Sequence, residues 1–143
     1  MKEKNRLLLD VEVVNRALNS QLQGQDAHVQ GQQLYKKFSE TRQEPVKLAV
    51  ALRGFFMETG VSSSEKETYG SYLKGRIRPA MEVLIEEENV EKMAMLEERG
   101  WFGQPQIEGF IKMAKERQKT SSLVWLLHLK NDKYGYSDYD FSL

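Results

Sequence analysis

The sequence contains no cysteine, and this absence excludes several kinds of chemistry at once. Without a thiol the chain can form no disulfide bond, no thiolate metal site and no cysteine nucleophile. It has only two histidines, His28 and His128, and neither has a carboxylate at the spacing of a metal-ligand pair. We therefore expect no metal and no cofactor, and we expect both histidines to be structural or surface residues.

Neither sign of charge is in excess, because 21 lysines and arginines balance 21 aspartates and glutamates. A neutral total argues against a protein whose main affinity is for a nucleic-acid backbone or an anionic membrane. No apolar run approaches the roughly 18 residues of a membrane span. The basic, apolar start of the chain is interrupted by Asp10 and Glu12, and no small-residue cleavage site follows it. The sequence thus predicts a soluble, cytoplasmic chain with no signal peptide and no membrane partner.

The first half of the chain repeats apolar residues at steps of three and four, the spacing of a helix with one buried face. Residues 4–22 show this spacing, although the segment 7–14 also alternates as a strand does. We favour a helix, because no turn residue occurs before Gly24 and no second strand follows that could pair with this one. After a glutamine-rich linker, Asp26 is expected to cap a second helix that ends near Thr41.

Two further helices are marked by their first residues. Pro45 suits the first turn of a helix that is apolar over much of its circumference, and such a helix belongs in the middle of a bundle. Gly60 is expected to end it. Two overlapping capping boxes follow, Ser62 with Glu65 and Ser64 with Glu67, and they predict the start of a connecting helix.

Residues 80–130 carry one apolar pattern twice, with an offset of about 30 residues. Each copy has a short helix, a polar break and a second helix, so each predicts a helix pair whose apolar stripe a neighbour must bury. The first pair is expected at 79–87 and 89–99. The second pair is expected to start at Gln104 or the residue after it, with its second helix capped by Thr120 or the residue after it. The offset aligns Met81 with Ile111, Leu84 with Ala114, Met93 with Leu123, Ala94 with Val124 and Leu96 with Leu126.

The spacing of these apolar residues, with Gly100 after the first pair and Leu127 in the second, resembles that of the paired helices of ankyrin repeats. The resemblance covers about a third of the chain. Ankyrin units repeat at 33 residues with T-P-L-H-x-A, whereas the corresponding positions here read P-A-M-E-V-L and G-F-I-K-M-A. The resemblance implies stacked helix pairs, which usually provide binding surfaces, and it transfers no ankyrin functional residue to this chain.

Together these patterns predict an all-α protein, a helical bundle or short α-solenoid of seven to eight helices whose C-terminal half is made of two ankyrin-like helix-turn-helix repeats. A chain of 143 residues suits a single helical domain with one core. Its expected parts are N-terminal helices at 1–60, a connecting helix at 61–78, two helix-pair repeats at 79–130 and an aromatic tail at 131–143. The expected core combines apolar residues of both halves, namely Leu48, Leu52, Phe55 and Phe56 with Leu84, Met93, Leu96, Ile111, Leu123 and Leu126. Val124 and Leu127 are also expected to be buried.

The chain has no nucleophile elbow, P-loop or dinucleotide-binding glycine motif, so we predict no catalytic residue and no enzyme. We predict instead a protein–protein interaction or regulatory module that binds another protein, with a homo-oligomer as a further option. In stacked helix pairs the first helices and connecting turns line one surface. That surface is expected to present Trp101, Phe102, Gln104, Lys112 and Lys115. The alternative for Trp101 is an aromatic lid that closes the end of the core.

A nucleic-acid-binding regulator is the second hypothesis. Lys112, Lys115 and Lys119 are three and four residues apart, so they would line one face of a helix or its continuation, as a phosphate-binding patch does. Glu108 and Glu116 lie among them, however, and the net charge is zero, so nucleic acid is the less favoured partner.

Two other groups of residues have alternative interpretations. A glutamate cluster could hold a cation or act as an acid and base pair, but a solvated face between two helices is favoured; its members are Glu86, Glu87, Glu88, Glu91, Glu97 and Glu98. The aromatic tail is expected either to pack on its own body or, less favoured, to dock into a partner groove; its members are Tyr134, Tyr136, Tyr139 and Phe141.

Overall fold

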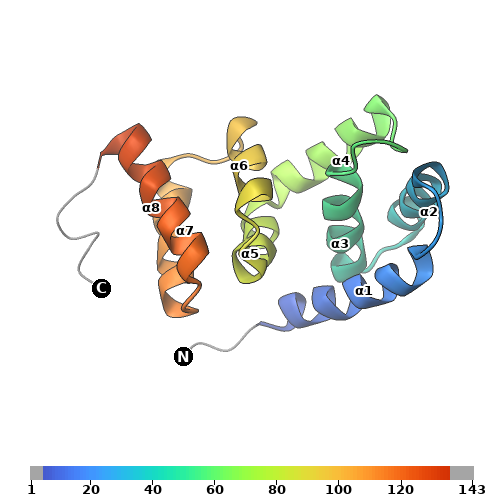
Figure 1. Cartoon of the computed structure of the whole chain (residues 1–143), viewed down its shortest axis with the longest axis horizontal. Helices are drawn as coiled ribbons and strands as arrows, with labels where there is room; N and C mark the ends of the chain where they lie inside the picture. The colour runs from blue at the N-terminus through green and yellow to red at the C-terminus, as the bar shows by residue number, and fades with distance from the viewer. Residues whose placement is uncertain (1–4, 136–143) are drawn as a thin grey trace. The chain divides into compact units, whose positions relative to one another are not determined.

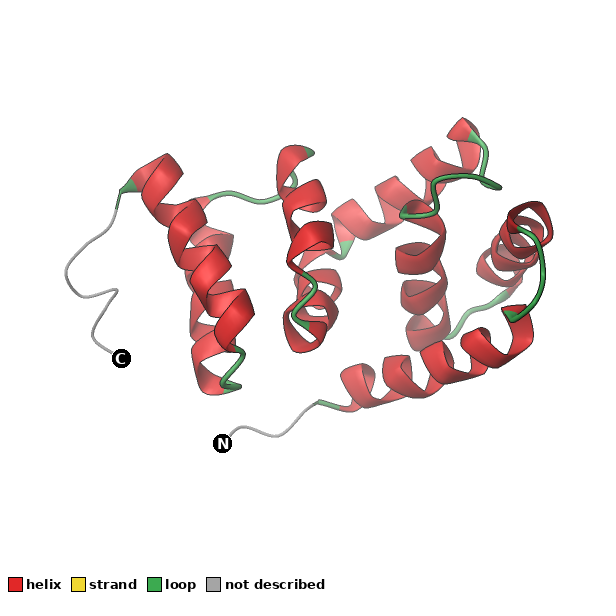
Figure 2. Cartoon of the chain, viewed as in Figure 1, coloured by secondary structure: helices red, strands yellow, loops and turns green. Residues whose placement is uncertain are grey.

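The computed structural model describes residues 5–135, and within that range it consists of eight α-helices with no strand (Figures 1 and 2). The all-α class and the number of helices are as predicted, and the segment 7–14 lies within a helix. The chain divides into two compact units, whose described parts are residues 5–76 and 77–135. The expected single core across both halves stays a prediction, and the aromatic tail from Tyr136 onward lies outside the described residues.

The first unit is organised around one buried helix. It contains α1 (Arg6–Leu22), α2 (Ala27–Glu40), α3 (Glu44–Phe55) and α4 (Ser63–Gly75). Helix α3 packs against each of the other three, as Figure 1 also shows, and so has the central place predicted for it. Because it meets neighbours on several sides, it is buried over most of its length, at Leu48, Ala49, Val50, Ala51, Leu52, Gly54 and Phe55.

Predicted capping residues start α2 and α4, and of the two capping boxes offered at α4 it is Ser62 with Glu65 that starts the helix. The Asp26 carboxylate accepts a hydrogen bond of 2.9 Å from the backbone N–H of Val29. Ser62 and Glu65 form the reciprocal capping box: the Ser62 hydroxyl accepts from the N–H of Glu65 at 3.1 Å, and the Glu65 carboxylate accepts from the N–H of Ser62 at 2.9 Å. These bonds satisfy backbone donors that the first helical turn leaves without partners.

The end of α3 differs from the prediction. The helix ends at Phe55 rather than near Gly60, and Phe56, at its C-cap, is only half-buried instead of fully in the core. Gly60 has a positive φ of 87° and lies in the following loop, against α2. A Cβ atom on Gly31 would stand 1.8 Å from the carbonyl oxygen of Gly60. The two glycines therefore permit a backbone approach between α2 and this loop that no other residue pair would allow.

The second unit consists of two helix pairs. The first pair is α5 (Ile77–Glu87) and α6 (Val90–Glu98), and the second is α7 (Gln104–Glu116) and α8 (Thr120–Tyr134). Helix α5 packs against α7 and α6 packs against α8, so the first helices of the pairs are neighbours and so are the second helices. The largest fully buried side chains of this unit are Met81, Leu84, Ile85, Met93, Leu96, Ile107 and Leu126.

The turns inside the two pairs have the same geometry. Glu88 and Gln118 both adopt the left-handed conformation, with φ of 55° and 58°, although neither is glycine. The residue after each turn position donates a 2.9 Å backbone hydrogen bond to the carbonyl five residues before it, from Asn89 to Leu84 and from Lys119 to Ala114. The corresponding residues of the two turns are 30 positions apart.

One buried face is predicted wrongly in the second unit. Val124 is 46 % exposed and Leu123 is half-buried, whereas Ser122, which carries no apolar side chain, is fully buried. The Ser122 hydroxyl donates a 2.9 Å hydrogen bond to the carbonyl oxygen of Ile85. That bond places Ser122 against α5, so the inward face of α8 runs through Ser122, Leu126, Leu127 and Lys130.

Candidate functional site

The predicted partner-facing residues fall on the connection before α7 and along α7 itself. Gln104 and Lys112 are exposed, and Trp101 and Lys115 are half-buried. Phe102 is different: it is only 7 % exposed, and its ring meets that of Phe110 edge to face, with centroids 5.4 Å apart. The prediction that Phe102 faces a partner is therefore wrong, because its ring is part of the core that closes this end of the unit.

Gln104 and Lys112 lie on one stripe of α7, since they are eight residues apart and every fourth residue returns to the same side of a helix. Glu108 lies between them, and its carboxylate is 2.8 Å from the Lys130 ammonium of α8. The stripe is thus polar with both signs of charge present, and its one carboxylate is paired with the neighbouring helix.

An open depression adjoins this stripe. It has a volume of roughly 240 Å³ and is lined by Arg78 of α5 and by Pro105, Gln106, Gly109 and Phe110 of α7. A Cβ atom on Gly109 would meet nothing within 4 Å, so packing inside the protein does not require glycine there. A glycine inside a helix costs about 1 kcal/mol relative to alanine. Gly109 was not among the predicted site residues, and the signal that could have found the depression is this unneeded glycine in a regular helix.

The three lysines of the nucleic-acid hypothesis have different surroundings. Lys119 lies in the turn before α8, and its ammonium is 3.0 Å from a Glu86 carboxylate oxygen. Lys112 is exposed and Lys115 half-buried on α7. Because Glu86 neutralises Lys119, only Lys112 and Lys115 on α7 remain of the three cations in the predicted phosphate-binding patch.

A buried ion cluster joins the two helix pairs. The Arg117 guanidinium donates a hydrogen bond to the Glu82 carboxylate, and its other terminal nitrogen lies 3.9 Å from a Glu86 oxygen. The side chains of Arg117, Glu82 and Glu86 are 7 %, 11 % and 10 % exposed, respectively. The prediction that Glu86 lies on a solvated face is therefore wrong. With Lys119 the cluster has two carboxylates and two cations, so its charges cancel, and it serves to hold the second turn against α5.

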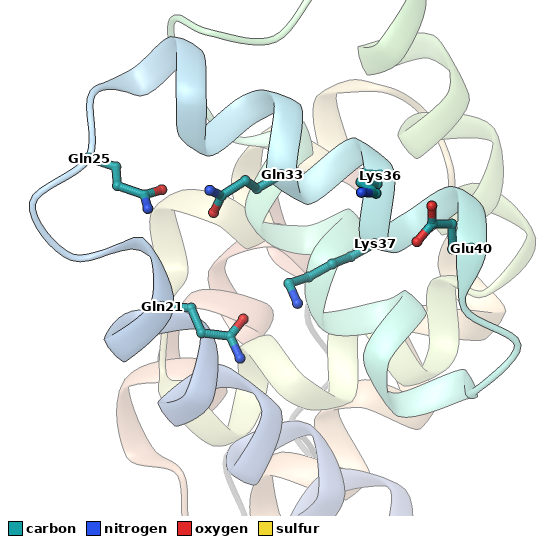
Figure 3. Close-up of a pocket in the computed structure, with 6 residues that line it drawn as sticks. All are labelled: Gln21, Gln25, Gln33, Lys36, Lys37 and Glu40. Atoms are coloured by element: carbon teal, nitrogen blue, oxygen red, sulfur yellow. The ribbon is translucent and has the colours of Figure 1, made fainter.

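A second open depression lies in the first unit, between the end of α1 and α2 (Figure 3). It has a volume of roughly 400 Å³, and the residues that line it are all of polar or charged types, namely Gln21, Gln25, Gln33, Lys36, Lys37 and Glu40. The side-chain oxygen of Gln25 is buried and accepts no hydrogen bond from any residue in the described part of the chain. The depression offers amides and charges of both signs, and none of its lining residues is of the hydrophobic or aromatic kind that predominates in small-molecule sites.

An aromatic cluster contributes the perturbed titratable groups of the first unit. The rings of Phe38, Tyr69 and Tyr72 meet edge to face, with Phe38 5.0 Å from Tyr69 and 5.4 Å from Tyr72 between centroids. Burial raises the pKa of the Tyr69 phenol above its ordinary value, and the nearby Glu65 carboxylate adds to this. The Tyr69 hydroxyl is buried and has no hydrogen-bond partner among residues 5–135. A neutral phenol in such a place acts as a packing group.

Comparison with known proteins gives no match: no protein-family model matches the chain, and no curated protein or solved structure is detectably similar to it. Within residues 5–135, no three histidine, aspartate or glutamate side chains are placed so that they could hold a metal ion. No helix in the same range combines the length and the apolar character that crossing a bilayer requires.

Proposed function

We propose that the second unit is a non-enzymatic protein-binding module made of two stacked, ankyrin-like helix pairs. The observation that carries the proposal is how the two helix pairs stack: α5 packs against α7, and α6 packs against α8. The turn that joins α5 to α6 also has the same geometry as the turn that joins α7 to α8. Helical repeat proteins stack their units in this way, and their extended surfaces bind other proteins. The likeness to ankyrin helix pairs is part of this proposal.

The binding surface in this proposal is the exposed side of α7 with the connection that precedes it. It comprises Trp101, Gln104, Lys112 and Lys115, together with the adjoining depression. The depression supports this choice because Gly109 keeps it open at a cost to helix stability that packing does not explain. Nucleic acid is a weaker candidate, because Glu86 neutralises Lys119.

Site-specific photocrosslinking tests the surface. A photoreactive amino acid at Gln104 should crosslink the same cellular protein as one at Lys112, while one at the exposed Glu91 of α6 should not. Filling the depression with Gly109→Leu should remove the crosslink. The matched control is Gly75→Leu, since a Cβ there also meets nothing within 4 Å. Equal crosslinking from all three positions, or an unchanged crosslink in Gly109→Leu, would contradict the proposed surface.

Trp101→Ala separates the two hypotheses for Trp101. If Trp101 is an interface anchor, the variant should lose the crosslinked protein with little change in melting temperature, because such anchors contribute mainly to binding. If it is a lid on the core, the melting temperature should fall markedly. A variant that changes neither quantity would show that Trp101 has neither role.

A further inference from the structure

Helix α1 has a second apolar stripe on the side away from its buried face. Leu9 and Val13 are 47 % and 56 % exposed, and they lie one turn apart. Ala17 and Ser20 continue the stripe as exposed small residues that leave room for a close neighbour. The buried face of the same helix is formed by Leu8, Val11, Leu18 and Leu22. The first unit therefore uses one side of α1 and leaves this stripe uncovered.

The charges beside the stripe are self-complementary. Glu12 and Arg16 lie on the same flank of the stripe, because α-helical geometry places residues four apart on one side. They are equally distant from residue 14, which is the midpoint of α1 from Arg6 to Leu22. If two copies of α1 pack antiparallel about that midpoint, each Glu12 faces Arg16 of the other copy. In a parallel pair, this flank of one helix would meet the opposite flank of the other, so Glu12 and Arg16 of the two copies would not face each other.

We propose that α1 is a self-association surface, on which a second copy of the chain binds through antiparallel packing of the two α1 helices. Val13 lies next to the two-fold axis and meets Val13 of the second copy, and two Glu12–Arg16 pairs flank this contact. Glu12 also interacts within its own chain, so the ion pairs contribute orientation more than affinity. The surface belongs to the first unit and is independent of the proposed protein-binding function of α7.

The dimer is expected to be weak. A helix of 17 residues is about 25 Å long, so one helix face covers less than the roughly 800 Å² per partner of a stable complex. We therefore expect dissociation constants of tens to hundreds of micromolar, on the order of 5–6 kcal/mol of binding free energy. Such an association is detected by measuring the fraction of dimer as the protein concentration is raised.

Sedimentation velocity of the full chain between about 10 and 500 µM tests the proposal, a range set by the expected affinity. The wild type should shift from monomer to dimer. Val13→Lys should abolish the shift, because it places two ammonium groups at the axis. Val124→Lys is the matched control: Val124 is 46 % exposed on α8, in the other unit, and this variant should dimerise normally.

Charge reversal tests the orientation. Glu12→Arg and Arg16→Glu should each weaken dimerisation by about tenfold or more, because like charges then face each other. An equimolar mixture of the two variants should dimerise again, since each arginine then faces a glutamate. Circular dichroism confirms that each variant is folded. A wild type that stays monomeric throughout the range would overturn the proposal, as would single reversals without effect or a mixture that does not recover.

Discussion

Replacing Arg117 with methionine should destabilise the second unit more than any exposed charge replacement. The Arg117 side chain is 7 % exposed and lies between two carboxylates that are 11 % and 10 % exposed. Methionine keeps most of the volume but leaves Glu82 buried without the guanidinium that faces it. Breaking a buried ion pair from one side costs about 3–5 kcal/mol. A small domain has about 5–15 kcal/mol in total, so the variant should lose a large part of its stability.

The same geometry predicts that removing both partners is less harmful than removing one. The Nε and one terminal nitrogen of Arg117 have no hydrogen-bond partner among residues 5–135, so the cluster is incompletely satisfied. Buried pairs of this kind can often be replaced by apolar side chains at little cost, because desolvation offsets most of their attraction. The double variant Glu82→Leu with Arg117→Met should therefore recover most of the stability that Arg117→Met loses.

Urea denaturation followed by circular dichroism measures these differences. Arg6→Met is the control, because the Arg6–Asp10 pair has side chains 91 % and 44 % exposed and should contribute less than about 0.5 kcal/mol. A loss below about 1 kcal/mol for Arg117→Met would refute the reasoning, since it would mean that water reaches the cluster. A double variant less stable than the single one would show that the pair itself, and not the orphaned carboxylate, carries the stability.

The elements that could be predicted from the sequence are those set by neighbouring residues. The capping box depends only on Ser62 and Glu65, three positions apart, and it forms as the pattern indicates. Helix α1 follows from the apolar residues that recur at steps of three and four within its own segment. The face that a helix buries is different, because its neighbours decide it. Ser122 is buried because its hydroxyl donates a hydrogen bond to a carbonyl of α5. Val124, which the repeat aligns with Ala94 and which was expected to be buried, is exposed.

The buried ion cluster escaped prediction for a related reason. Glu82 and Arg117 are 35 positions apart in sequence, and no local pattern joins them. A glutamate in a charged stretch is usually solvated, so Glu86 gave no sign of burial. Burial became favourable only when the packing of α5 against α7 brought cations to both carboxylates. In contrast, Gly109 was visible as an exception to a helical pattern, so that part of the candidate surface could have been found from sequence alone.

Three other predictions follow from particular contacts. Gly31→Ala should cost roughly 1–3 kcal/mol or more, measured by urea denaturation, because its Cβ would strike the Gly60 carbonyl. Leu126→Ala should cost about 2–5 kcal/mol in the same assay, and Phe56→Ala less, since Leu126 is fully buried and Phe56 half-buried; the reverse order would contradict these burials. The last prediction concerns Tyr69, whose raised pKa means that the fold favours the neutral phenol. Its contribution to stability is present below about pH 10, the ordinary value, and is lost as the pH rises above it. Tyr69→Phe has no proton to lose and gives up no hydrogen bond, so it should be about as stable as the wild type near neutral pH and should lose less stability between about pH 9 and 11. Parallel losses in the two proteins would show that the phenol ionises as easily in the folded state as in the unfolded one.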